Sequence, residues 1–211
     1  MKKNITYLSL VLVGFLLITS CNKNKGNFHL GGTIIDDSFS QNLIGATVKL
    51  YQTPVGSSSQ LLVASTTTDA NGEYHFTFKR EKMEKYTLVV SKNNYFEKTT
   101  EIPFSDFSLE EEEEIVNVTT TAKSWVRITL SNTDPLPGDV LTYTKQNGKI
   151  NCDECCPTSA VNYYGALDTV FYCINDGNTN YSFLYSASGI GSGIKSISTT
   201  AFDTVDLQLF Y

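Results

Sequence analysis

The feature that most constrains how this chain folds is a recurring alternation of apolar and polar side chains along short segments. Such segments recur along the chain, at 45–50, 73–79, 86–90, 126–130 and 205–210. In 73–79, for example, Tyr74, Phe76 and Phe78 alternate with polar residues. A period of two places alternate side chains on opposite faces of a β-strand, so these segments predict sheets with one buried face. No segment of useful length shows a helical period, and we predict an all-β protein.

Turn-forming pairs separate several of these segments. Asn71-Gly72, Asn147-Gly148 and Asp176-Gly177 tolerate positive φ, and each is a cue for a β-hairpin. The pattern stops near Thr121 and restarts at Val126. We therefore predict two antiparallel β-sandwiches in tandem, at 28–121 and 122–211.

Composition supports packed cores and excludes one class of partner. Hydrophobic residues make up 41% of the chain, which is ample for a folded protein. The net charge is -6, and removal of Lys2 and Lys3 with a signal peptide would make it more negative. A negative chain is unsuited to electrostatic binding of nucleic acid, so we predict no nucleic-acid partner.

The first residues indicate export. Lys2 and Lys3 precede a short apolar stretch at 8–18, and small residues follow it up to Cys21. This is the pattern of a secretory signal peptide, and the apolar stretch is too short to span a bilayer as a mature helix. An uncleaved anchor helix and an ordinary signal peptide that leaves Cys21 unmodified are the alternatives.

The sequence Ile18-Thr19-Ser20-Cys21 resembles a bacterial lipobox, in which the cysteine thiol is lipidated and becomes the new N-terminus. The resemblance implies a signal peptide at 1–20, a lipidated tether at 21–27 and membrane attachment through acyl chains. Lipoproteins that related anaerobes export to the cell surface often carry acids directly after the cysteine. This chain carries Asn22-Lys23-Asn24-Lys25, which favours the periplasmic face of the outer membrane over the cell surface.

The first half also resembles a known family. The motifs that carry the likeness occur in a fixed order, as Gly32–Asp36, Ile44–Leu50, Thr67–Phe76 and Tyr86–Val90. In this order they are similar to the carboxypeptidase regulatory-like domain, a seven-stranded prealbumin-type (transthyretin-like) β-sandwich, over about 27–120. The resemblance implies an accessory module of the kind found on exported peptidases, outer-membrane transporters or lipoproteins. Such modules are seldom catalytic. The second half resembles the C-terminal β-domains of anaerobe lipoproteins, but only in its general pattern of short strands.

Four cysteines besides Cys21 form a candidate structural site. They are Cys152, Cys155, Cys156 and Cys173. Adjacent Cys155 and Cys156 have Cα atoms about 3.8 Å apart, below the range of about 4.4–6.8 Å that a disulfide needs. We therefore predict two disulfides, in which Cys173 pairs with Cys155 or Cys156 and Cys152 takes the other. A zinc site and a redox Cys-x-x-Cys motif are the alternatives, and neither matches its usual spacing or setting.

Candidate catalytic groups are scarce. His29 and His75 are the only histidines, and each lies between inward-facing neighbours, so each is expected to point outward. Hydroxyisourate hydrolases, the enzymes among transthyretin-like proteins, end in Tyr-Arg-Gly-Ser, whereas this chain ends in Gln208-Leu209-Phe210-Tyr211. The acidic run 110–114 is interpreted as a solvated loop rather than a calcium or basic-partner site. We predict no enzymatic activity, no metal and no cofactor.

Two further surface sites are weaker candidates. Trp125, Tyr163 and Tyr164, with Tyr172, are candidates for a platform on which sugar rings stack, although such residues in a sandwich are more often core or sheet surface. Thr169 and Thr204 lie in Asp-Thr-Val patterns that match an O-glycosylation pattern of some anaerobes.

The sequence thus predicts a lipid-anchored envelope protein that acts as a binding or assembly module without turnover. Carbohydrate and another envelope protein are the candidate partners. The alternatives are an adhesion or fimbria-like structural component, and an enzyme with its site near the cysteine loop of the second domain.

Overall fold

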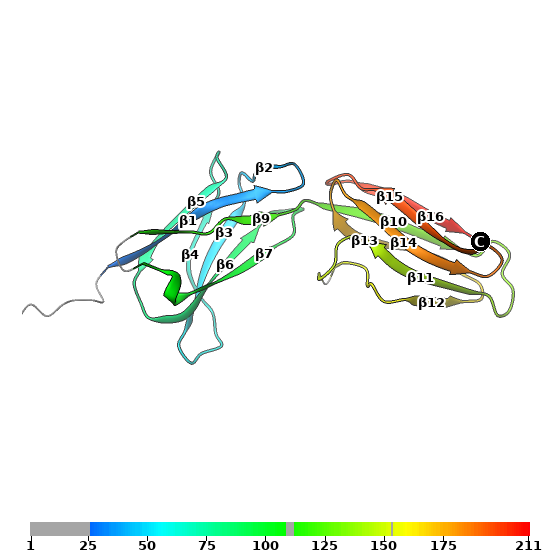
Figure 1. Ribbon diagram of the computed structural model, residues 1–211, viewed down its shortest axis with the longest axis horizontal. Coiled ribbons are helices and arrows are strands. Elements are labelled where there is room, and N and C mark those ends of the chain that lie inside the picture. The colour runs from blue at the N-terminus through cyan, green and yellow to red at the C-terminus, as the bar shows by residue number, and fades with distance from the viewer. Residues whose placement is uncertain (1–25, 109–111, 153) are drawn as a thin grey trace, which may run out of the picture.

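The computed structural model describes residues 26–108, 112–152 and 154–211. The regular structure of these ranges is almost all β, in four sheets arranged as two sandwiches (Figure 1). The one helical element that they contain is a single 3-10 turn, η1 (Phe104–Asp106). None of the helical structure described has the length or apolar character needed to cross a bilayer. The predicted all-β fold is confirmed, whereas the signal peptide and Cys21 lie outside the described residues.

The first sandwich contains two sheets. One has the order β4-β3-β6-β7, and the other is built on β1, which pairs with β5 and β2 in antiparallel and with β8 and β9 in parallel fashion. The strands are β1 (Asn27–Asp36), β2 (Gln41–Asn42), β3 (Thr47–Pro54), β4 (Leu61–Thr67), β5 (Glu73–Lys79), β6 (Met83–Ser91), β7 (Lys98–Pro103), β8 (Glu113–Ile115) and β9 (Val118–Thr120).

The core of the first sandwich follows from the alternation in its strands. Tyr74, Phe76 and Phe78 of β5 are buried while the residues between them are exposed. They pack with apolar residues of both sheets, including Phe28, Leu50 and Leu88. Burial of a large side chain of this kind stabilises the fold by about 1.5–3 kcal/mol, which is why the alternation fixes the face that each strand presents.

The second sandwich also contains two sheets, with the orders β13-β10-β16 and β12-β11-β14-β15. Its core includes Val126, Ile128, Tyr143, Phe183 and Leu207. The strands are β10 (Lys123–Ser131), β11 (Val140–Asn147), β12 (Val161–Tyr164), β13 (Asp168–Asp176), β14 (Asn180–Ala187), β15 (Gly191–Ser198) and β16 (Thr204–Phe210).

The two sandwiches share one topology. In each, the first strand lies between an antiparallel fourth strand and a parallel last strand, as in β5-β1-β8/β9 and β13-β10-β16. The facing sheets also correspond strand for strand, as β4-β3-β6-β7 and β12-β11-β14-β15, and every pairing in them is antiparallel. The short β2 and the split of the last strand into β8 and β9 distinguish the first copy. Both halves therefore present seven strand positions in the same order.

Two of the three predicted hairpin cues do not join paired strands. Asn71-Gly72 does form a turn, in which the Gly72 amide donates to the carbonyl of Asp69, with φ of 73° at Gly72. The strands that it connects, β4 and β5, belong to opposite sheets, as do β13 and β14 around Asp176-Gly177. Asn147-Gly148 does stand between paired strands, β11 and β12, but the long cysteine loop joins them instead of a tight turn. A turn of this chemistry reverses the chain equally well within one sheet or across the sandwich, so the hairpin prediction was wrong at Asn71-Gly72 and at Asp176-Gly177.

Candidate functional site

The boundary between the sandwiches is built from turns that carry aromatic side chains. The ring of Phe202, in the turn between β15 and β16, stacks on that of Phe39, with ring centres 5.8 Å apart. It also meets the edge of the Tyr95 ring at 5.4 Å. Phe39 and Tyr95 come from two different turns of the first sandwich. The rings thus join three turns into one contact, which we call the joint; it also includes Ser38, Phe96, Lys149 and Asn178.

Hydrogen bonds fix the same contact from both sides. The Ala122 amide donates to Oγ of Ser38 at 2.9 Å, and Nδ2 of Asn178 donates to the Ser38 carbonyl oxygen at 2.9 Å. Asn178 has φ of 59°, a conformation that asparagine tolerates better than most residues. Both bonds end on Ser38, one on its side-chain oxygen and one on its carbonyl oxygen. Because they hold Ser38 at two atoms, they restrain the orientation of the second sandwich relative to the first.

A buried carboxylate supports the joint from inside the first sandwich. Asp36 is fully buried, and its carboxylate accepts hydrogen bonds from the Tyr95 hydroxyl at 2.8 Å and the Ser38 amide at 3.0 Å. Burial, followed by the hydrogen bond to Asp36, raises the pKa of Tyr95 above its usual value. Tyr95 therefore stays a neutral donor over the physiological range, and its ring is held in place for Phe202.

Phe96 of the first sandwich lies between two lysines of the second. Nζ of Lys149 is 4.5 Å from the ring centre, and Nζ of Lys123 is 5.3 Å from it. Lys149 is held there by Asp176, at 2.7 Å from its ammonium. The Phe96 side chain is only 6% exposed, so the cation–π contacts act in a partly desolvated place, where each contributes about 0.5–2 kcal/mol.

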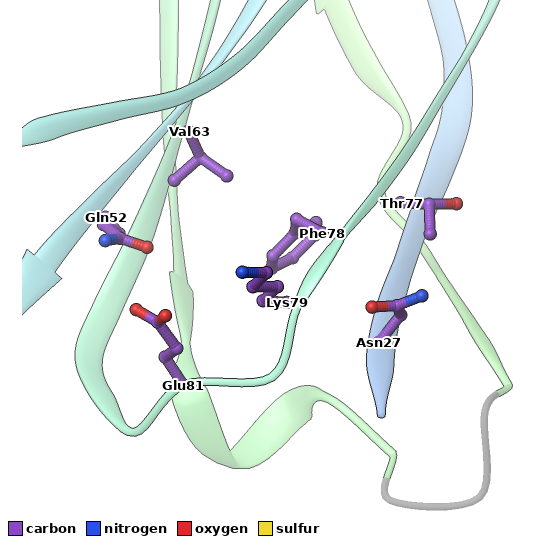
Figure 2. Close-up of a pocket in the computed structure, with 7 residues that line it drawn as sticks. All are labelled: Asn27, Gln52, Val63, Thr77, Phe78, Lys79 and Glu81. Atoms are coloured by element: carbon purple, nitrogen blue, oxygen red, sulfur yellow. The ribbon is translucent and has the colours of Figure 1, made fainter. Parts of the chain in front are cut away.

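A shallow opening of about 390 Å³ lies between the two sheets of the first sandwich, on the side where β4 and β5 form the sheet edges. Figure 2 shows Phe78 and Lys79 in the middle of this opening, with Gln52, Val63 and Glu81 on one side and Asn27 and Thr77 on the other. Lys79 and Glu81 give it charge of both signs. Its other polar lining residues are Asn27, Gln52 and Thr77.

The four cysteines form two disulfides, as predicted, and the structure selects one of the two pairings left open. Cys152 pairs with Cys155, and Cys156 pairs with Cys173, with Cα–Cα distances of 5.4 and 5.1 Å. The second bond ties the loop between β11 and β12 to strand β13. A second opening, of about 340 Å³, is lined by Cys152, Cys155, Cys156 and the loop residues Ile150, Asn151, Pro157 and Thr158.

The buried side chain of Lys145, on β11, binds the cysteine loop through hydrogen bonds. Its side chain is only 4% exposed, and its ammonium donates to the carbonyl oxygens of Lys149 and Cys156. Burial lowers the pKa of Lys145. The loop is therefore attached to the sandwich by a disulfide and by a buried cation, and its residue Lys149 in turn contacts Phe96 at the joint.

The predicted sugar platform is not assembled as expected. Trp125 lies on the outer face of β10, because its neighbours Ser124 and Val126 are buried. Tyr163 packs against the core of the second sandwich, whereas Tyr164 is 70% exposed on β12 of the opposite sheet. The residue that does share the face of Trp125 is Tyr172 on the neighbouring strand β13. Successive residues of a strand point to opposite faces of the sheet, so the side chains of Tyr163 and Tyr164 point in opposite directions. Their adjacency in the sequence therefore does not place them in one binding surface.

The other predicted residues are placed as follows. Thr204 is exposed at the start of β16, next to Trp125, while Thr169 is half-buried on β13. His75 is exposed, and its Nδ1 lies 2.8 Å from a carboxylate oxygen of Glu113, a residue of the acidic run. The side-chain hydrogen bond to Glu113 is the main cause that raises the pKa of His75 above 6.5. No group of three or more potential metal-ligating side chains occurs within the described residues.

The fold and these sites define a class: a tandem all-β protein in which two sandwiches of one topology meet at the joint. No protein-family model matches the sequence. A search of curated proteins likewise finds no match.

Among solved structures, similar chains include the TIE protein of Bacillus anthracis and two pilins. The TIE protein of Bacillus anthracis is 15% identical, with a TM-score of 0.37, over 87% of this chain and 34% of that one. A streptococcal ancillary pilin is 15% identical, with a TM-score of 0.36, over 86% and 62%. The shaft pilin of Lactobacillus rhamnosus GG is 10% identical, with a TM-score of 0.38, over 88% and 98%.

Half of the chain is also similar to an enzyme. Catechol 1,2-dioxygenase from an Acinetobacter species is 16% identical, with a TM-score of 0.35, over 49% of this chain and 55% of that one. This chain thus spans about a third of the TIE chain and about half of the dioxygenase chain. At these scores none of the likenesses carries an argument about family or activity.

Proposed function

We propose that this protein is a lipid-anchored display module of the cell envelope that works as a structural or adhesion component without turnover. The observation that carries the proposal is the joint. It holds the two sandwiches end to end, so that the start of β1 and the C-terminus lie at opposite ends of the molecule (Figure 1). A chain tethered at its N-terminal end would present the second sandwich away from the membrane.

The joint supports a structural role because it is more specific than a linker needs to be. A flexible tether between domains would be rich in glycine and serine and would make few contacts. Here Phe202, Phe96 and Ser38 each make defined contacts across the boundary. A fixed orientation of one sandwich relative to the other is useful to a protein that presents a surface in a set direction. A passive spacer does not need it.

The anchoring part of the proposal rests on the sequence at Cys21. Acylation there would supply about 0.8 kcal/mol for each buried methylene, and more than one chain gives a stable anchor. We place the protein on the periplasmic face of the outer membrane, since lysines rather than acids follow the cysteine. O-glycosylation of exposed Thr204 is part of the proposal, and an intact mass equal to that of the acylated polypeptide alone would exclude it.

We also propose that the first sandwich belongs to the carboxypeptidase regulatory-like domains. The places that the motif residues take in the fold support this assignment. Gly45-Ala46 leads directly into β3, and Asp69–Gly72 forms the turn that crosses from β4 to β5. The seven strand positions agree with the number in that family.

Detergent phase separation and bilayer measurements together test the proposal. The mature protein should enter the detergent phase, and Cys21→Ser should leave it in the aqueous phase. On a supported bilayer, neutron reflectometry should show a layer whose thickness matches an upright pair of sandwiches. Substituting Phe96→Ala and Phe202→Ala together should make that layer thinner and more diffuse while the protein remains anchored. Equal detergent partitioning of Cys21→Ser would refute the anchor, and an unchanged layer in the double variant would refute the role of the joint.

Glycan capture is the second candidate function. One observation favours it: half-buried Trp125 and exposed Tyr172 lie on the same face of the second sandwich.

A further inference from the structure

The outer face of the sheet β13-β10-β16 carries an ordered set of side chains. Ser124, Val126, Ile128 and Leu130 of β10 are completely buried, so the alternate residues Trp125, Arg127 and Thr129 face outward. The register places these residues in three rows across the sheet. The rows are Ile174–Trp125–Thr204, Tyr172–Arg127–Asp206 and Val170–Thr129–Gln208.

Two side chains of the middle row are joined by hydrogen bonds. Arg127 binds the carboxylate of Asp206 with both Nε and Nη2, the latter at 2.8 Å from Oδ2. Tyr172 is the cross-strand partner of Arg127 on β13, so its ring lies beside the same guanidinium. A bidentate arginine–carboxylate pair has a fixed geometry. The Arg127–Asp206 pair is therefore arranged before any ligand arrives, and both residues still present free donors and acceptors to solvent.

The apolar side chains of this face lie in that row and in the two rows beside it. Tyr172 is 56% exposed and Val170 is 53% exposed. Trp125 is a diagonal neighbour of Tyr172, at the spacing of about 7–8 Å typical of such pairs. The face thus offers two neighbouring aromatic residues, Trp125 and Tyr172, with the hydrogen-bonded Arg127–Asp206 pair next to them.

We propose that this face binds a neutral saccharide, with a pyranose ring stacked on Trp125 or Tyr172 and its hydroxyl groups bonded to Arg127 and Asp206. Aromatic rings pack well against the apolar C–H face of a sugar, and a paired guanidinium and carboxylate can donate to and accept from neighbouring hydroxyls. The proposal rests on the proposed function, in which the second sandwich is the part displayed.

Charge and area both favour this ligand over others. The two charges of the middle row neutralise each other, so the row offers no net attraction to a phosphate or an acidic polymer. The two aromatic residues are already partly buried, so each offers a ligand less than the 150–250 Å² or so that a fully buried aromatic side chain covers. Their combined area is well below the roughly 800 Å² per partner of a stable protein interface. A surface of this size and neutrality suits a small polyhydroxylated ligand better than a second protein.

The chain provides its own probe for the test, because Trp125 is its only tryptophan. The mature full-length chain is titrated with cellohexaose, maltohexaose, mannohexaose, xylohexaose and chitohexaose while tryptophan emission is recorded. At least one of these should give a saturable change in emission. Tyr172→Ala and Arg127→Gln should each weaken that binding about tenfold or more. Tyr164→Ala, which removes an exposed tyrosine from the opposite sheet, is the matched control and should leave it unchanged.

Three results would overturn the proposal. They are the absence of an emission change with all five oligosaccharides, equal binding by Tyr172→Ala, and a self-association of the wild type in sedimentation that Tyr172→Ala abolishes. The last result would assign the face to a second copy of the chain. Because the titration is done in solution, its outcome does not depend on lipidation, and detergent partitioning of Cys21→Ser tests the anchor separately.

Discussion

The ammonium of Lys149 lies 4.5 Å above the ring of Phe96, and this contact crosses the boundary between the two sandwiches. Lys149 belongs to the loop that Cys156 and Lys145 attach to the second sandwich. The joint therefore depends on residues that are themselves anchored, and its stiffness is a property of both halves of the chain.

Phe96→Ala should loosen the joint. It removes two cation–π contacts, each of about 0.5–1 kcal/mol or more, so openings of the boundary should become about tenfold more frequent or greater. Hydrogen exchange measures this at the Ala122 amide, which donates to Ser38, and at the Lys123 amide, which donates to the carbonyl oxygen of Asn94. Phe210→Ala, which truncates an exposed phenylalanine of β16, is the control and should leave both rates unchanged. Unaltered exchange in Phe96→Ala would show that the lysine contacts do not stabilise the boundary.

The two disulfides should differ in their contribution to stability. Cys156 and Cys173 are 17 residues apart, whereas Cys152 and Cys155 are 3 apart. Loop-closure entropy predicts that loss of the longer link costs about 3 kcal/mol and loss of the shorter about 1.6 kcal/mol. Urea unfolding of Cys156→Ala/Cys173→Ala and of Cys152→Ala/Cys155→Ala checks the order. A larger loss from the second pair would contradict the assigned roles.

The pKa of His75 should depend on Glu113. Their side-chain hydrogen bond raises that pKa above 6.5, so Glu113→Gln should lower it toward the ordinary value. Because the folded-state pKa is the higher one, the stabilisation is present below about pH 6.5 and is lost as pH rises through the folded-state pKa. The effect on unfolding should be small, since the His75 side chain is 64% exposed. NMR titration of the imidazole measures the shift, with Glu73→Gln as a control that should change it less.

Tyr86 should make the protein sensitive to alkali. Burial, with a smaller effect of Glu81, raises the pKa of Tyr86 to about 12. The folded state therefore favours the protonated phenol, and this contribution to stability is lost as pH rises from about 10, the unfolded value, toward 12. Tyr86→Phe should lower the pH dependence of the unfolding free energy between pH 9 and 11, as measured by urea titration followed by circular dichroism. An unchanged slope would place the phenol of Tyr86 in contact with solvent.

Much of the fold could be predicted from the sequence because it depends on local pattern. The alternation in 73–79 and 205–210 identified the inward side chains of β5 and β16. The turn at Asp69–Gly72 was also recognised, but its chemistry does not reveal whether the next strand joins the same sheet. The cysteine pairing stayed open between two choices, since both satisfy the backbone spacing and only the fold brings Cys173 to Cys156.

The joint and the outer face of β10 could not be predicted for a different reason. Phe39 and Phe202 are 163 positions apart in turns that show no periodic pattern, so only the packed structure brings their rings together. Tyr172 and Arg127 likewise meet through the register of β13 against β10. The one signal of the joint in the sequence was the presence of aromatic residues in polar turns. Such residues do not reveal which other turn they contact.

Residual dipolar couplings of the mature chain in a dilute aligned medium test the central claim most directly, because they report the orientation of each sandwich relative to the other. The account predicts that a single alignment tensor fits the amide couplings of β1 to β9 and of β10 to β16 together. Two tensors of clearly different magnitude, one for each sandwich, would show that they reorient independently and would contradict a locked joint.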